Sequence, residues 1–136
     1  MTHPFARTEA LIGADALQRL ADSRVAVFGL GGVGGYAAEA LARCGVGALD
    51  LFDGDKVSLT NLNRQIVALH STLGRFKADV MRERVLDINP QCRVAAHRVY
   101  YVPENADQYD LGAYDYIVDA VDMVSAKVEL AVRAQA

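Results

Sequence analysis

Short apolar runs alternate with segments of helical periodicity along this chain. Four runs rich in apolar and β-branched residues occupy positions 24–28, 48–52, 93–99 and 116–118. Runs of this length, bounded by turn residues, predict buried strands. The intervening segments predict helices over residues 11–21, over a stretch ending at Cys44, over residues 76–88 and from about Ser125 onward.

The helix after the first strand is predicted from one apolar stripe. Val33, Ala37, Leu41 and Cys44 are spaced by four, four and three residues, which places them on one helix face. Gly45 follows as a residue suited to the left-handed conformation at a helix end. We therefore expect this stripe, including Cys44, to lie in the core.

Strands that alternate with helices predict an α/β fold. Right-handed crossovers favour a Rossmann-like, doubly wound and mainly parallel sheet with helices on both faces. Residues 54–74 show little apolar periodicity, and a loop of this length in a compact domain is usually functional. The chain stops just after the fourth strand, so we expect a domain truncated at its C-terminal side.

Composition narrows the function class without deciding it. The 136 residues are 52% hydrophobic and 23% charged, which excludes wholesale disorder, collagen and coiled coil. Only two cysteines occur, without a CxxC motif, which argues against a disulfide scaffold or a structural zinc site. No apolar stretch approaches a membrane span. The expected protein is reduced and cytoplasmic, and its net charge of −3 gives no independent support for nucleic-acid binding.

A glycine-rich loop lies between the first predicted strand and the next helix. Gly29, Gly31, Gly32 and Gly34 form the pattern GxGGxG. Such a loop lets the backbone come close to phosphate oxygens. The free N–H groups at the start of the following helix then stabilise the phosphate charge. Asp53 ends the next strand, where a carboxylate can accept both hydroxyls of a ribose. The loop predicts a nucleotide site, but NAD and ATP would fit it equally.

Further polar residues favour ATP over NAD. Arg64, Lys77 and Asp122 fall in segments that can reach the same edge of the sheet as the glycine loop. Two cations suit phosphoryl or nucleotidyl transfer, and a carboxylate can hold Mg²⁺ on phosphate oxygens. Each residue also has an ordinary interpretation, as a solvated surface cation or as an acid at a helix start. Their joint occurrence supports the functional one.

The ordered set of motifs resembles the ThiF/MoeB/HesA family, the bacterial relatives of ubiquitin-activating enzymes. These motifs are the glycine loop, Asp53-x-Asp55, residues 61–65 (NLNRQ), Lys77, residues 88–90 (INP) and Asp119-x-x-Asp122. The resemblance implies that residues 1–136 are the N-terminal nucleotide-binding domain of a longer family domain. It also implies an enzyme that adenylates a carboxylate with ATP and Mg²⁺.

The same resemblance assigns roles to residues of this sequence. Arg64 and Lys77 would stabilise the reacting phosphates, Asp122 would hold the magnesium ion, and Arg7 would reach into the partner subunit of a homodimer. The nucleotide-binding set it implies is Gly29, Gly31, Gly32, Gly34, Asp53, Asp55, Thr60, Asn61, Asn63, Arg64, Lys77 and Asp122.

Within the family, the sequence resembles the branch that dehydrates threonylcarbamoyladenosine in tRNA. Residues 7–13, 39–45 and 119–122 carry this likeness, and Met123 stands where activators of protein modifiers have Asn. Three alternatives stay open: activation of a ubiquitin-like sulfur-carrier protein, an NAD-dependent oxidoreductase, and a non-catalytic nucleotide-binding domain. Basic residues at 75, 77, 82, 84, 93 and 98 would suit a tRNA surface, or would simply be solvated.

Overall fold

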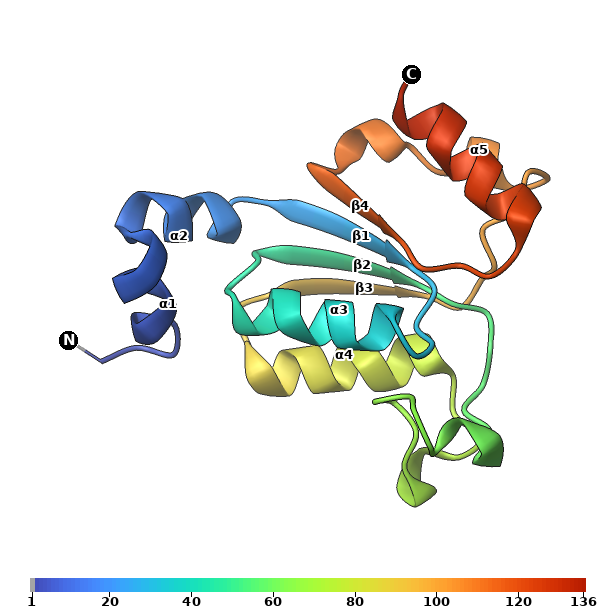
Figure 1. Ribbon diagram of the computed structural model, residues 1–136, viewed down its shortest axis with the longest axis horizontal. Helices are drawn as coiled ribbons and strands as arrows, with labels where there is room; N and C mark the ends of the chain where they lie inside the picture. The colour runs from blue at the N-terminus through green and yellow to red at the C-terminus, as the bar shows by residue number, and fades with distance from the viewer. Residues whose placement is uncertain (1) are drawn as a thin grey trace.

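The computed structural model describes residues 2–136 and contains one parallel sheet (Figure 1). Its strands are β1 (Arg24–Phe28), β2 (Ala48–Phe52), β3 (Arg93–His97) and β4 (Tyr116–Asp119), in the spatial order β3-β2-β1-β4. The chain moves outward from β1 to β3 and then crosses to the other side of β1. This reversal between β1 and β4 is where ligands bind in doubly wound folds. The predicted fold class is confirmed.

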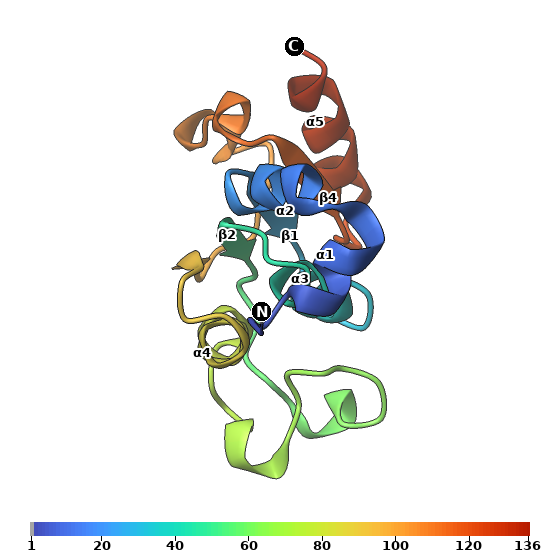
Figure 2. The ribbon, with the colours of Figure 1, turned by 90° about the vertical axis from the view of Figure 1, so that its left-hand side faces the viewer.

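Helices cover both faces of the sheet. On one face, α3 (Gly34–Arg43) and α4 (Lys77–Ile88) pack over a core that includes Val27, Leu51 and Met81. On the other face, α5 (Val124–Ala134) covers a smaller cluster around Phe28, Phe52 and Leu130. Figure 2 views the molecule from the side, with α4 nearly end-on and α5 well separated from it. The central strands β1 and β2 are thus largely removed from water, and this burial is the main stabilising contribution.

The N-terminal helix prediction is wrong in its extent. Instead of one helix over 11–21, the chain forms α1 (Ala6–Ile12) and α2 (Ala14–Ala21). Gly13 separates them with a φ of 88°, a left-handed conformation that glycine adopts without strain. The apolar pattern could not show this break because neither helix buries a residue fully.

The apolar stripe predicted for α3 is also wrong. Val33 is 72% exposed and Cys44 is exposed, so Cys44 does not belong to the core. The buried residues of α3 are small ones, namely Gly34, Gly35, Ala38 and Ala42. Small residues let the helix approach the sheet closely, and a search for large apolar side chains overlooks them.

The remaining boundaries follow the prediction closely. Lys77–Ile88 forms the expected helix, the last helix begins at Val124, and the third strand stops at His97. The long loop after β2 contains two short 3₁₀ turns, Leu59–Asn61 and His70–Thr72. Cys92 is buried, and burial raises the pKa of its thiol. No helix among residues 2–136 is long and apolar enough to cross a membrane.

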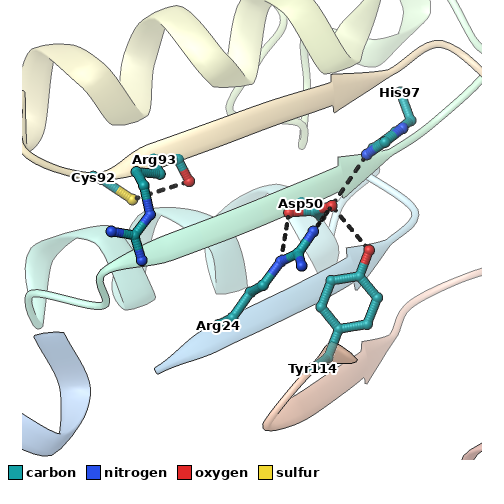
Figure 3. Close-up of polar contacts among 6 residues, drawn as sticks. All are labelled: Arg24, Asp50, Cys92, Arg93, His97 and Tyr114. Atoms are coloured by element: carbon teal, nitrogen blue, oxygen red, sulfur yellow. Dashed lines mark hydrogen bonds and ion pairs between the residues drawn. The ribbon is translucent and has the colours of Figure 1, made fainter. Parts of the chain in front are cut away.

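A polar cluster around Asp50 joins residues of β1, β2 and β3 and of the segment before β4 (Figure 3). Asp50 of β2 accepts hydrogen bonds from Arg24 Nη2 at 2.9 Å and from Tyr114 Oη at 2.9 Å, and its Oδ2 lies 3.2 Å from His97 Nε2. Burial alone would raise the pKa of Asp50, but these partners together hold it below its ordinary value. The charge and hydrogen-bonding capacity of this buried carboxylate are therefore satisfied by groups of the protein itself.

Candidate functional site

A cleft of about 500 Å³ opens at the carboxyl ends of β1, β2 and β4. It lies at the switch point between β1 and β4 and is walled by the long loop and by the start of α4. Nine of the residues predicted for the site line it: Gly29, Gly31, Gly32, Asp53, Asp55, Asn61, Arg64, Lys77 and Asp122. Segments far apart in the sequence therefore contribute side chains to the same cleft.

The glycines of the loop divide into two groups. A Cβ on Gly34 would lie 1.6 Å from the carbonyl oxygen of Gly29, and one on Gly29 would lie 2.5 Å from that of Ala120. These two glycines are required by close backbone packing. At Gly31 and Gly32 the nearest atoms to a Cβ are 3.6 Å and 3.8 Å away, and both residues face the cleft. The space beside them is open to a ligand.

Asp53, directly after β2, lines the cleft and is 8% exposed. Its Oδ2 accepts from the backbone N–H of Leu30 at 2.8 Å and its Oδ1 from that of Asp55 at 2.7 Å. Burial raises the pKa of Asp53, although these two bonds and the charge of Lys77 oppose the rise. Among residues 2–136, each oxygen accepts one hydrogen bond, so the carboxylate retains acceptor capacity toward the cleft.

Lys77, the first residue of α4, is 5% exposed. Its Nζ lies 3.8 Å from Asp55 Oδ2, and the Tyr100 hydroxyl donates to the other oxygen of Asp55. This bond raises the pKa of Tyr100 to about 12, so the phenol is a donor at neutral pH. In the described part of the chain this is the one ion pair of Lys77, and it is long, so the buried ammonium group is well placed to meet an anion in the cleft.

Arg64 extends from the long loop over the glycine loop. Its Cγ would be 3.8 Å from a Cβ on Gly32, and its Nη1 donates to the Thr60 carbonyl and to Asn63 Oδ1. No carboxylate pairs with Arg64 among residues 2–136, so its charge is available to the cleft. The neighbouring Asn61 is buried, where its Oδ1 accepts from Ser58 and shapes the turn.

Asp122 follows β4 and faces the cleft with an exposed carboxylate. Asp119, by contrast, accepts from the Val121 N–H and pairs with Lys127 at 3.2 Å, as expected for a structural acid. Within the described residues, no three His, Cys, Asp or Glu side chains gather as a metal site. One carboxylate suits Mg²⁺ when phosphates and waters supply the other ligands.

The two walls of the cleft differ in polarity. On the α5 side, apolar and aromatic side chains from the second core cluster line it: Phe28, Phe52, Val99, Tyr101 and Val121. Opposite them are the glycine loop and the polar residues of the long loop. A flat apolar group on one side, phosphates on the other and a sugar at Asp53 would match this arrangement.

Four predicted residues do not line the cleft. Gly34 is buried in backbone packing, and Thr60 and Asn63 are exposed and contact Arg64. Arg7 is exposed on α1, at the opposite end of the sheet from the cleft (Figure 1). A role for Arg7 in nucleotide chemistry therefore requires a second copy of the chain.

Sequence reasoning assigned no role to several residues of the cleft, among them Gln65 and Tyr100. Gln65 is 8% exposed and lies beside Gly31, and Tyr100 closes over Gly54 from the segment after β3. Gln65 directly follows Arg64 in a quoted motif, so its position was the available signal. Tyr100 carries no motif, because its role depends on how the chain returns after β3.

Comparison with known proteins decides the family. The profile of the ThiF family matches residues 5–136. The chain belongs to the ThiF family. It is 48% identical over 130 residues to the tRNA threonylcarbamoyladenosine dehydratase of Bacillus subtilis, covering 96% of this chain and 51% of that protein. It is 39% identical over 112 residues to the probable adenylyltransferase/sulfurtransferase MoeZ of Mycobacterium tuberculosis, covering 82% of this chain and 28% of MoeZ.

The fold of this chain also matches a solved structure closely. The Escherichia coli tRNA N6-threonylcarbamoyladenosine dehydratase TcdA, solved in complex with ATP, superposes with a TM-score of 0.91 at 49% identity. The match covers 93% of this chain and 52% of that chain. This chain thus spans about half the length of the relatives it matches.

Proposed function

We propose that this ThiF-family chain binds ATP and activates a carboxylate by adenylation. The observation that carries the proposal is the convergence of the glycine loop, Asp53, Arg64 and Lys77 on one cleft. An NAD-dependent oxidoreductase would use the glycines and Asp53 but would leave the two cations idle. The ATP complex of the E. coli relative supports the same choice of ligand.

The cleft suggests a role for each of its main residues. Asp53 accepts hydrogen bonds from the ribose, and the backbone at Gly31 and Gly32 approaches the phosphates. Arg64 and Lys77 stabilise charge that develops on the reacting phosphate, an effect that grows in the transition state. Asp122 would hold Mg²⁺, which neutralises charge on the phosphate oxygens when it is bound.

The proposed reaction has two balanced steps. A carboxylate oxygen of the substrate attacks the α-phosphorus, and the bond to the β-phosphate breaks with release of pyrophosphate. A nitrogen of the same substrate then attacks the activated acyl carbon, loses a proton and displaces AMP. The net change is ring closure with loss of water, and it needs no nucleophilic cysteine. Both cysteines of this chain lie outside the cleft lining.

The substrate we propose is the threonylcarbamoyl side chain of a modified adenosine in tRNA. The relative at 48% identity is named for that dehydration, whereas the sulfurtransferase-type relative is 39% identical. Met123, which lines the cleft directly after Asp122, also departs from the Asn of protein-modifier activators. The basic residues give no further support, because Arg75, Arg84 and Arg98 are paired with acids.

ATP–pyrophosphate exchange tests this substrate. Exchange should depend on tRNA that carries threonylcarbamoyladenosine and should be absent with unmodified tRNA. Exchange that is stimulated instead by a sulfur-carrier protein with a Gly-Gly C-terminus would contradict the tRNA substrate. It would support the alternative function, activation of a sulfur carrier. Arg19→Ala, which removes an exposed arginine of α2 outside the cleft, is the control for removal of a charge elsewhere on the surface.

We further propose a cytoplasmic homodimer in which Arg7 completes the partner's site. The distance of α1 from its own cleft supports this arrangement (Figure 1). Mixing Arg7→Ala with Asp53→Ala protein should restore part of the exchange activity, because one site of a mixed dimer keeps both residues. Two variants that remain inactive after mixing, in a proven dimer, would contradict it.

A further inference from the structure

Gln65 is a buried polar residue that the roles above leave unexplained. It is 8% exposed, and its Oε1 has no hydrogen-bond partner in the part of the chain that the structure describes. An unpaired buried amide oxygen costs free energy, and native proteins rarely retain one without a use. Two other buried polar side chains of the long loop, Asn61 and Thr72, are hydrogen-bonded.

The Gln65 amide lies at the glycine loop. Its Nε2 would be 3.6 Å from a Cβ on Gly31, one of the two loop glycines that have open space beside them. Gln65 also lines the cleft, directly after Arg64 in the chain. An amide N–H in this position can donate to an oxygen of a ligand that lies along the loop.

We propose that Gln65 is a further binding residue, whose side-chain amide donates a hydrogen bond to a phosphate oxygen of the bound nucleotide. The inference rests on the proposed ATP site and deepens it. Arg64 and Lys77 supply charge, whereas Gln65 supplies a neutral donor held by burial at a fixed place. The unpaired carbonyl Oε1 is the cost of holding the amide N–H at that place.

The matched pair Gln65→Met and Gln108→Met tests this. Methionine keeps the length of the side chain and removes the amide, and Gln108 is exposed and outside the cleft. Thermal unfolding of the ligand-free proteins and calorimetric titration with ATP and with adenosine are the readouts. We expect Gln65→Met to unfold no earlier than wild type, because it removes an unsatisfied group.

The same variant should bind ATP about tenfold more weakly, the size expected for one hydrogen bond to a charged group. Adenosine, which lacks phosphates, should bind within twofold of wild type, and Gln108→Met should change neither ligand. Opposite signs for stability and affinity separate this role from a structural one. If Gln65→Met fails to fold, Gln65→Asn, which keeps the amide but withdraws it by one methylene, should show the same selective loss.

Three results would overturn the assignment: ATP affinity equal to wild type, an equal loss for ATP and adenosine, or unfolding temperatures of both ligand-free Gln65→Met and ligand-free Gln65→Asn that lie below the wild-type value. If wild-type protein binds adenosine as tightly as ATP, the ATP proposal itself is overturned. The titrations of wild-type protein test this separately from the variants.

Discussion

Asp50 and Asp53 lie three residues apart on the same stretch of chain and are both buried, but their pKa values are shifted in opposite directions. Asp50 is surrounded by Arg24, His97 and Tyr114, and these partners lower its pKa (Figure 3). Asp53 lines the cleft and accepts hydrogen bonds from two backbone N–H groups, and burial raises its pKa.

The difference separates structural from ligand-directed chemistry. At Asp50 the protein supplies the full set of charged and polar partners, so the cluster favours folding and has little left for a ligand. At Asp53, Gln65 and Arg64 the protein leaves acceptors, donors or charge toward the cleft. Incomplete satisfaction at a strand end is therefore a better guide to the site than burial or charge alone.

The glycine loop offers the largest test of this distinction. Gly34→Ala should lose more than about 4 kcal/mol of unfolding free energy or fail to fold, because its Cβ meets backbone at 1.6 Å. Gly32→Ala, with ordinary space, should unfold as wild type does and bind ATP more weakly. Chemical denaturation and ATP titration measure both. Equal stability of the two variants would remove the division between packing and ligand glycines.

Two arginines extend the comparison. Arg64→Ala should lower the rate of ATP–pyrophosphate exchange by roughly 30- to 1000-fold, about 2–4 kcal/mol, and ATP affinity by much less. Its stability should be unchanged, because Arg64 is exposed and contacts only local groups. Arg24→Ala should instead destabilise the fold and leave exchange by the folded fraction intact. Equal losses of rate and affinity for Arg64→Ala would argue against transition-state stabilisation.

The two aspartates can be exchanged for alanine in parallel. Asp53→Ala should weaken ATP binding by about 100-fold, the loss of two hydrogen bonds to ribose, while the fold persists. Asp50→Ala should cost about 2–3 kcal/mol of stability, moderated because Arg24 is partly exposed and regains water. Its ATP affinity should match that of wild type. Unchanged ATP affinity in Asp53→Ala would remove the ribose assignment.

Acid provides the smallest and most specific test. A carboxyl whose pKa is lower in the folded protein than its usual 3.8 stabilises the fold above that pH, and the benefit is lost as the pH falls through the folded value. Wild-type stability should therefore drop more steeply below about pH 4 than that of Asp50→Asn. Asp53, whose pKa is raised, acts in the opposite direction. Parallel pH profiles for wild type and Asp50→Asn would contradict the ion-pair account.

The sequence predicted the strands and the polar edge well, because those rest on local pattern and on topology. Asp53 and Asp122 could be placed together since the carboxyl ends of parallel strands share one edge, and Arg64 and Lys77 fall in segments that can reach it. The break at Gly13 and the buried small residues of α3 were missed, because neither leaves a periodic trace of large side chains. Tyr100 and the unpaired Gln65 amide depend on tertiary contacts that one sequence does not encode locally.

A crystal structure of this chain with ATP and Mg²⁺ tests the central claim most directly. We predict the ribose at Asp53, the phosphates along Gly31 and Gly32 within hydrogen-bond reach of Arg64 and Lys77, and the metal ion between the phosphates and Asp122. Phosphates that point away from these side chains, or a nucleotide bound outside the cleft, would contradict the account.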